Sequence, residues 1–250
     1  MAARRFLLAG HSHAHSLGMT NPTTPNAIEI QTIDYLDGRI LGLSGPAPRT
    51  AAYWDALVRE AKDTTVLLIW NGNQHLAKFL FEIDKPFDFF LASRPGLEPT
   101  KAELVPEAQV REVLDAGNEF LYKLLVRLKE VPGCRVVLLG TPPPKGNDTR
   151  LRHFIQREAF FVQMAAKAGS NVNEIRLTDR AVRLKLWAVI QDLLSEAADN
   201  HGCGFLAVPE TVKDGDGFLR EDLWWEDATH ANAQYGRIYW ETMLPQVGAA

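Results

Sequence analysis

The chain has 250 residues, of which 46% are hydrophobic, which is enough apolar material for one large or two small globular domains. Lysine and arginine number 27 against 31 aspartate and glutamate residues, a net charge of -4 without a long run of either sign. This charge balance argues against a surface that tracks phosphates, so nucleic acid is not an expected partner.

The amino-terminal stretch MAARRFLLAGHSHAH has basic residues followed by an apolar run that ends after five residues in a group of histidines. A secretory signal peptide needs a longer apolar segment and a cleavage site. No window approaches the roughly 20 apolar residues that span a bilayer. We therefore expect no membrane span and a cytoplasmic location. Because Cys134 and Cys203 adjoin strand-like runs, we expect both to be buried free thiols.

Short apolar runs alternate with longer segments of helical period, a pattern typical of an α/β sheet with crossover helices. The runs VLLIW and VVLL lack polar alternation, so both faces of these strands should be covered, as in a parallel sheet. In chain order, the pattern predicts strands at 5–10, 28–36, 65–71, 135–141 and 204–210, and helices at about 50–62, 105–130, 151–168, 178–200 and 231–244. Residues 76–104, rich in Phe and Pro, are expected to form a lid or an insertion.

No repeat or linker divides the chain, so residues 1–250 are expected to form one domain. The predicted architecture is a three-layer α/β/α sandwich with a five-stranded, mainly parallel sheet. In such sheets ligands bind outside the carboxyl ends of the strands, so the residues directly after each strand are informative. They are GHSHAHSLG at 10–18, NGNQH at 71–75 and, near the chain end, WWEDATHANAQYG at 224–236.

These segments contain the parts of a serine nucleophile site. A hydroxyl nucleophile needs a base within hydrogen-bond reach, a third group that orients the base, and donors for the oxyanion. The sequence DATH places Asp227 three residues before His230, so the carboxylate can turn back onto the imidazole from one loop. If this loop adjoins the first strand, His230 can take the proton of Ser12. The expected oxyanion donors are the amides near Ser12 and Gly45 and the side chain of Asn73.

The order of these segments resembles the SGNH or GDSL hydrolase family, whose four blocks carry Ser, Gly, Asn and His. The four matching segments are FLLAGHSHAHSLG, ILGLSGPAPRTAAYWDAL, VLLIWNGNQH and DATHAN. The resemblance implies a flavodoxin-like fold and a serine-dependent esterase or acylhydrolase that needs no cofactor and acts on a small acyl ester. It places Ser12 as nucleophile, His230 as base, Asp227 as the residue that orients it, and Ser12, Gly45 and Asn73 in the oxyanion hole.

Two of the four blocks depart from the family pattern. His11 stands where the family has aspartate, and His13 follows the nucleophile. The third block reads NGNQ, so its leading glycine and trailing aspartate are replaced. These departures leave the substrate open among acetylated sugars, lipids, thioesters and peptides. The residues expected to contact it are His11, His13, Asn71, His75 and Trp225.

Four alternatives remain at this point. Ser16 is the rival nucleophile if the register is shifted by one turn. An acyltransferase would use the same site with an alcohol as acceptor. A metal hydrolase would use His11, His13 and His15, since imidazole binds zinc, although the barrels that begin this way need about eight βα units. A noncatalytic binding module on the same fold is the fourth alternative. The sequence predicts no oligomeric state.

Overall fold

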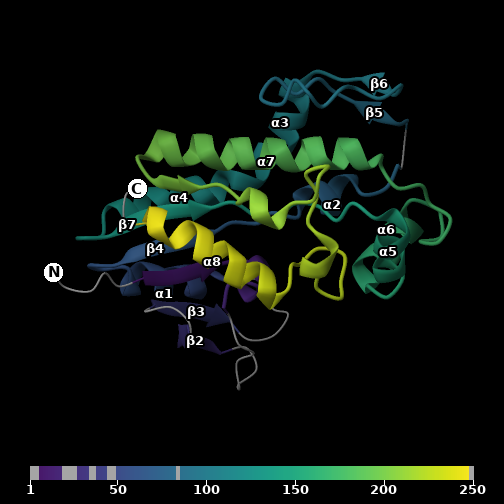
Figure 1. Cartoon of the computed structure of the whole chain (residues 1–250). Coiled ribbons are helices and arrows are strands. Elements are labelled where there is room, and N and C mark those ends of the chain that lie inside the picture. The colour runs from purple at the N-terminus through teal and green to yellow at the C-terminus, as the bar shows by residue number, and fades with distance from the viewer. Residues whose placement is uncertain (1–5, 19–26, 34–37, 44–48, 83–84, 248–250) are drawn as a thin grey trace.

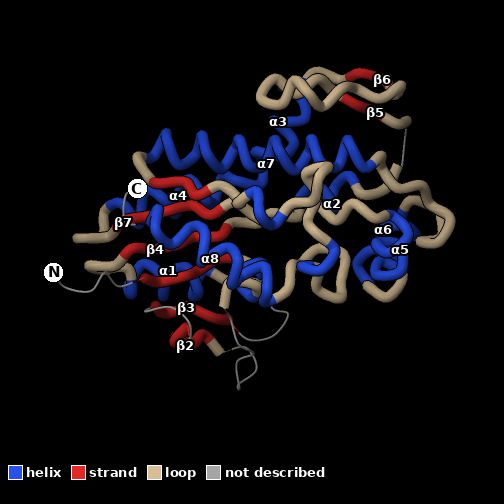
Figure 2. The backbone as a smooth tube through the Cα atoms, viewed as in Figure 1, coloured by secondary structure: helices blue, strands red, loops and turns tan. Residues whose placement is uncertain are grey.

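A computed structural model describes residues 6–18, 27–33, 38–43, 49–82 and 85–247 (Figure 1). Its centre is a sheet with the strand order β2-β3-β1-β4-β7-β8, drawn in red in Figure 2. The strands are β1 (Phe6–Gly10), β2 (Ile28–Ile33), β3 (Gly38–Leu43), β4 (Thr65–Ile69), β7 (Arg135–Leu139) and β8 (Gly204–Leu206). All neighbours pair in parallel except β2, which is antiparallel to β3. The prediction of a mainly parallel sheet is confirmed.

The predicted number of five strands was wrong, because the described residues form a sixth, β3. Its sequence GRILGL contains two glycines and an arginine, and such residues weaken a strand pattern. What makes it a strand is pairing: β3 lies parallel to β1 on one side and antiparallel to β2 on the other. The expected strand at 28–36 becomes the edge strand β2, and residues 34–36 lie outside the described part of the chain.

Helices alternate with the strands as predicted, but two expected helices are broken. The α-helices are α1 (Ala51–Glu60), α2 (Gln74–Phe79), α3 (Glu107–Asp115), α4 (Glu119–Lys129), α5 (Asp148–Ile155), α6 (Ala159–Lys167), α7 (Arg180–His201) and α8 (Ala233–Val247). A 3-10 turn, η2 (Ala116–Asn118), separates α3 from α4, and glycine and asparagine in it are poor helix formers. Between α5 and α6, Glu158 adopts an extended conformation.

The helices form layers on the two faces of the sheet. Helix α1 contacts α4, α4 contacts α7, and both α4 and α7 pack on β7. Helix α8 packs on β8 and crosses the sheet on the side that faces the viewer in Figure 1. The three-layer α/β/α prediction is therefore confirmed. The carboxyl ends of the parallel strands meet at one edge of this sandwich, where the functional segments follow them.

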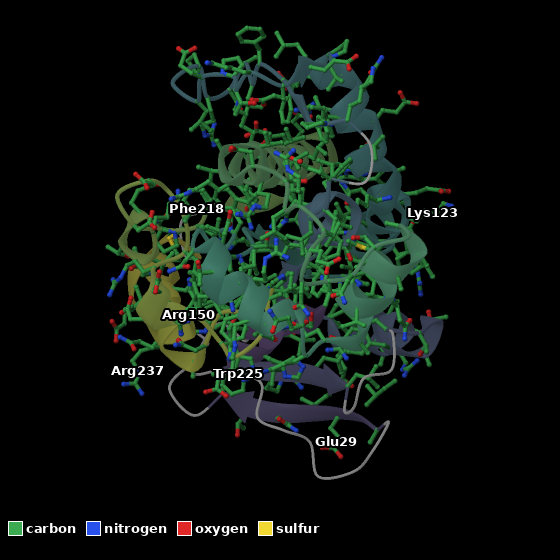
Figure 3. The ribbon with its side chains drawn as sticks, turned by 90° about the vertical axis from the view of Figure 1, so that its right-hand side faces the viewer. Glu29, Lys123, Arg150, Phe218, Trp225 and Arg237 are labelled. Carbon is green, nitrogen blue, oxygen red and sulfur yellow. The ribbon has the colours of Figure 1, made fainter. Side chains whose placement is uncertain are left out.

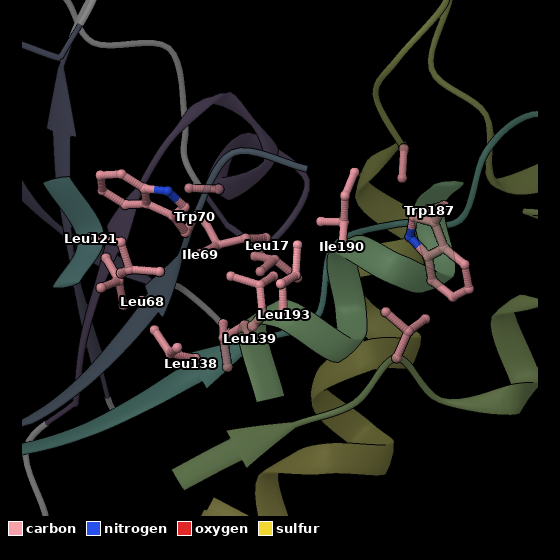
Figure 4. Close-up of a cluster of buried hydrophobic side chains, with 14 of the residues drawn as sticks. Leu17, Leu68, Ile69, Trp70, Leu121, Leu138, Leu139, Trp187, Ile190 and Leu193 are labelled. Atoms are coloured by element: carbon pink, nitrogen blue, oxygen red, sulfur yellow. The ribbon is translucent and has the colours of Figure 1, made fainter. Parts of the chain in front are cut away.

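The central strands and helix α7 share a hydrophobic core. Figure 4 shows Leu138 and Leu139 of β7 beside Ile190 and Leu193 of α7, and all four side chains are buried. Leu68 of β4 is likewise fully buried. Burying a side chain of this size contributes about 1.5–3 kcal/mol relative to leaving it in water. The unbroken apolar runs of the sequence therefore correspond to strands covered on both faces.

The segment expected as a lid or insertion carries a second, small parallel sheet of β5 (Phe87–Asp88) and β6 (Glu103–Leu104), which lies above α7 in Figure 1. A buried ion pair joins it to α7: Lys185 Nζ lies 2.8 Å from Asp88 Oδ1, and both side chains are fully buried. Lys185 also donates to the carbonyl oxygens of Phe89 and Glu98. These contacts make the segment an insertion that is fixed to α7.

The two cysteines are free and half-buried, at the amino-terminal ends of β7 and β8. Burial raises the pKa of the Cys134 thiol to about 11, so it is protonated near neutral pH. None of the helices in the described part of the chain has the length and hydropathy that crossing a bilayer requires.

Candidate active site

Strand β1 delivers the proposed nucleophile to the carboxyl edge of the sheet. Gly10 ends the strand with φ +140°, and a Cβ there would lie 1.9 Å from the carbonyl oxygen of Ile69 in the neighbouring strand β4. Only glycine permits this close approach. The amide of His11 then donates to Ile69 O at 3.1 Å, and Ser12 begins the 3-10 turn η1 (Ser12–His15). The first amides of such a turn have no partner within it.

The two ends of the chain meet at Ser12. Its Oγ lies 2.7 Å from His230 Nε2, and His230 Nδ1 lies 2.6 Å from Asp227 Oδ2. With the proton of the imidazole on Nδ1, facing the carboxylate, Nε2 is the nitrogen that accepts a hydrogen bond from the Ser12 hydroxyl. The structure thus brings together Ser12, His230 and Asp227, as the sequence predicted, in one hydrogen-bonded relay.

The carboxylate of Asp227 is held in its charged form. Oδ1 accepts the backbone amides of His230 at 2.7 Å and Thr229 at 2.9 Å, which leaves Oδ2 for the imidazole. Burial alone would favour the neutral acid, but the hydrogen bonds and charge of His230 outweigh it and hold the pKa of Asp227 well below its usual value. The acceptor for the His230 proton is therefore ionised at any pH near neutral.

The third block, NGNQ, forms a tight turn although two of its residues differ from the family pattern. Asn71 has φ +45°, in the left-handed region that asparagine tolerates better than most residues and where the family has glycine. A Cβ on Gly72 would lie 2.5 Å from Thr141 Cβ, and Gln74 Oε1 accepts the Gly72 amide at 2.9 Å. Asn73 begins α2 without using its half-buried side chain as a cap, so its amide group is not committed to that helix.

His11 connects the first and third blocks. Its Nδ1 accepts the backbone amide of Asn71 at 3.1 Å, and its ring packs against Trp54 and Trp70. Burial, together with the charge of Arg49, lowers the pKa of His11 to about 4, so the ring is neutral and can act as an acceptor. An acceptor directly before the nucleophile is the feature that the family's aspartate also supplies.

Solved structures with similar chain paths include hydrolases. An extracellular lipase from Streptomyces rimosus has a TM-score of 0.54 and 15% identity, over 98% of this chain and 100% of that chain. A catalytic mutant of Axe2, an acetylxylan esterase from Geobacillus stearothermophilus, has a TM-score of 0.53 and 12% identity, over 98% of this chain and 94% of that chain. The fold is that of the SGNH hydrolases. No protein-family model matches the sequence, and the comparison with curated proteins found no match.

In the SGNH fold of this chain, the three histidines of HSHAH do not converge. Because a 3-10 turn has three residues per turn, side chains at alternate positions point in different directions. His11 faces the third block, His13 is buried with its ring centroid 5.1 Å from that of His230, and His15 is exposed. Among the described residues, no group of three or more potential metal ligands forms.

Two of the residues expected to contact the substrate are buried, so these two predictions were wrong. His13 and His75 are each only 2% exposed, so neither ring lies open to a ligand. Burial lowers the pKa of His75 to about 3 and that of His13 well below its usual value, so both rings are neutral. Trp225, in contrast, is 56% exposed and remains available to contact a substrate.

The structure tests the prediction for Ser16 but not the one for Gly45. Ser16 is 5% exposed, and its hydroxyl donates to the carbonyl oxygen of His13 at 2.8 Å. It therefore serves the turn and lacks the imidazole partner that Ser12 has. Gly45, the expected second oxyanion donor, lies outside the described residues.

The two tryptophans before the relay have different surroundings. Trp224 is buried and donates from Nε1 to the carbonyl oxygen of Leu219 at 2.9 Å, with the guanidinium of Arg150 4.8 Å from its ring centroid. Figure 3 shows Trp225 and Arg150 on the same face of the molecule. Trp224 is thus part of the core, whereas Trp225 forms surface next to the relay.

Sequence reasoning missed two charged residues that contact the Asp227 loop. Lys145, which follows three prolines after β7, is buried, with an exposed fraction of 2%. The Glu158 carboxylate accepts the amide of Ala228 at 2.7 Å. The available signal for Lys145 was its position at the carboxyl edge of a central strand. No local signal pointed to Glu158, which reaches the loop only through the break between α5 and α6.

Proposed function

We propose that the chain is a serine-dependent esterase or acylhydrolase with Ser12 as its nucleophile. The relay from Asp227 through His230 to Ser12 is the observation that supports this most, because it joins residues from opposite ends of the chain at hydrogen-bond distance. Catalytic mutants of Axe2 replace a serine, an aspartate and, three residues later, a histidine with alanine. Asp227 and His230 have that same spacing.

In the proposed reaction, Ser12 Oγ attacks the ester carbonyl while its proton passes to His230 Nε2. The imidazolium is stabilised by the ionised carboxylate of Asp227. The tetrahedral intermediate then expels the alcohol, which takes the proton from His230, and an acyl-serine remains. Water attacks this acyl-serine with His230 as base, which releases the acid and restores Ser12.

The developing oxyanion needs donors near Ser12. We assign the Ser12 amide, at the start of η1, and the side chain of Asn73, at the start of α2, with Gly45 as the third donor. These segments follow the paired strands β1 and β4 in register. Each donor should contribute roughly 2–4 kcal/mol to lowering the barrier. No cofactor takes part in this chemistry.

The proposed substrate is a small acyl ester. Trp225, half-exposed beside the relay, is the side chain that we assign to its apolar part. Water is the acceptor in a hydrolase, and an alcohol in the same position would make the enzyme an acyltransferase. Comparing acid release with ester exchange in the presence of an added alcohol separates these two reactions.

A fluorophosphonate probe tests the nucleophile directly, because it phosphonylates an activated serine much faster than an ordinary one. We expect one adduct by intact mass, mapped to Ser12, in the wild type and in Ser16→Ala, and none in Ser12→Ala. Likewise, the wild type and Ser16→Ala should hydrolyse p-nitrophenyl acetate, and Ser12→Ala should not. An adduct on Ser16, or no adduct on the folded protein, would contradict the proposal.

A further inference from the structure

Among the described residues, the side-chain ammonium of Lys145 hydrogen-bonds to the loop that carries Asp227. Its Nζ donates to the carbonyl oxygens of Trp225, at 2.8 Å, and of Asp227. The same nitrogen lies 3.8 Å from Asp227 Oδ1. An ammonium has three N–H donors and no acceptor, so two of its donors are used by these carbonyl groups, while the carboxylate interacts with its charge.

The surroundings of Lys145 are mostly apolar. Its ammonium lies 5.0 Å from the ring centroid of Phe154 in α5 and 5.3 Å from that of Trp224. The charged groups that face it are Asp227 on the loop, Arg150 on α5 and Glu158 before α6. A buried ion pair often contributes no more stability than well-packed apolar side chains. Stability alone is therefore a weak reason for a lysine here.

The Asp227 loop, residues 225–230, has its backbone held from several sides. The Trp225 amide donates to the carbonyl oxygen of His230 at 3.0 Å, which closes the loop at its base. Lys145 holds carbonyl groups, and Glu158 holds the Ala228 amide. Because the loop has no strand or helix of its own, these side chains determine where its backbone lies.

We propose that Lys145 is a positioning residue that holds the Asp227 loop so that Asp227, His230 and Ser12 stay aligned. This inference rests on the proposed function. In the described contacts Lys145 reaches Asp227 but not His230 or Ser12, so it acts through the aspartate. Loss of its donors would release the carbonyls of Trp225 and Asp227, and a misplacement of about 1 Å in a catalytic group costs on the order of 100-fold in rate.

The insertion offers a matched control. Lys185 is also fully buried, lies 2.8 Å from the carboxylate of Asp88 and donates to two backbone carbonyls, but it holds the insertion instead of the relay. Lys145→Met and Lys185→Met remove the same charge and the same kind of contacts. A purely structural role for Lys145 predicts equal effects of the two changes on Ser12.

The experiment measures thermal unfolding of the wild type and both variants, then the rate of fluorophosphonate labelling of Ser12 below the lower melting temperature. We expect Lys145→Met to label about 10- to 100-fold more slowly, with a lower kcat and a similar KM for p-nitrophenyl acetate. Lys185→Met should label at the wild-type rate. Lys145→Arg, which keeps the charge and the donors, should regain part of the rate.

Proton NMR adds a reading that a structural role would not change. The low-field signal of His230 Nδ1–H, hydrogen-bonded to Asp227, should weaken or shift in Lys145→Met and persist in Lys185→Met. Wild-type labelling of folded Lys145→Met, or equal slowing of both methionine variants, would overturn the inference. If Lys145→Met does not fold, Lys145→Arg decides: labelling slower than in both the wild type and Lys185→Met supports the inference, and labelling as fast as in either of them overturns it. Absence of labelling in the wild type would instead overturn the proposed function.

Discussion

Two irregular segments of this molecule, the insertion and the Asp227 loop, are each held by one buried lysine that contacts backbone carbonyls and a carboxylate. In the insertion the carboxylate is used entirely for structure. Asp88 Oδ1 accepts from Lys185 and from the Phe89 amide, and Oδ2 accepts the Thr100 amide. Both oxygens are satisfied within the fold, so this ion pair acts as an anchor.

In the Asp227 loop, the lysine and the backbone amides leave one carboxylate oxygen for the imidazole of His230. Backbone amides and the more distant Lys145 occupy Oδ1, while Oδ2 meets His230 Nδ1 at 2.6 Å. The difference shows that a buried lysine and aspartate can either close an ion pair or position a carboxylate for a third group. Which one occurs depends on how the backbone amides are distributed: two amides share Asp227 Oδ1, whereas each oxygen of Asp88 accepts one amide.

The largest expected contrast between the two segments comes from neutralising each aspartate. Asp227→Asn should lower kcat for an activated ester about 10³- to 10⁴-fold, because the imidazole loses its orienting anion. Asp88→Asn leaves Lys185 buried without its counter-ion and should lower the unfolding free energy by about 3–5 kcal/mol while turnover persists. Steady-state kinetics and urea unfolding of both variants measure the two effects. Comparable loss of turnover in both would remove the functional distinction between the segments.

A smaller effect is expected on the pH dependence of the unfolding free energy, which reports the charge of Lys145 independently of its hydrogen bonds. Burial lowers the pKa of Lys145 to about 8, whereas an unfolded lysine titrates near about 10.4. Between these values the unfolded chain binds the extra proton, so stability rises with pH. Below about pH 8 the lysine is charged in both states and the cost of burying it is fully present.

The measurement is urea unfolding of the wild type and Lys145→Met at pH 7 and pH 9.5. The wild type should gain about 2 kcal/mol of stability relative to the variant over this interval, since about 1.5 pH units lie above the folded pKa of about 8 and one unit corresponds to about 1.4 kcal/mol. Other titrating groups cancel in the difference between the two proteins. A difference that is constant or moves in the opposite direction would contradict a charged, buried Lys145.

Only a small effect on turnover is expected at His13, whose buried ring contacts His230 without hydrogen bonding to the described residues. His13→Ala should keep turnover within about tenfold, or ~1.4 kcal/mol of barrier, while the cavity lowers the unfolding free energy by about 2–4 kcal/mol. Kinetics, thermal unfolding and metal analysis of the purified variant test this. Complete loss of turnover together with loss of a bound metal would instead favour a metal hydrolase.

The sequence by itself determined the layered architecture and which segments reach the functional edge. Its apolar runs without alternation can be stable only when covered on both faces, which predicts parallel strands with their carboxyl ends together. From this order follow Ser12 after β1, Asn73 after β4 and the Asp227 and His230 pair before α8. These are local patterns, so they can be recognised without knowing the contacts.

Only the tertiary structure decided how the remaining groups are used. Strand β3 becomes a strand through its two neighbours, the histidines of HSHAH separate because η1 is a tight turn, and Ser16 is buried in that turn. Lys145 and Glu158 reach the Asp227 loop from positions distant in the chain. Such contacts depend on which side chains meet after folding, and no periodicity or motif spacing in one sequence contains that information.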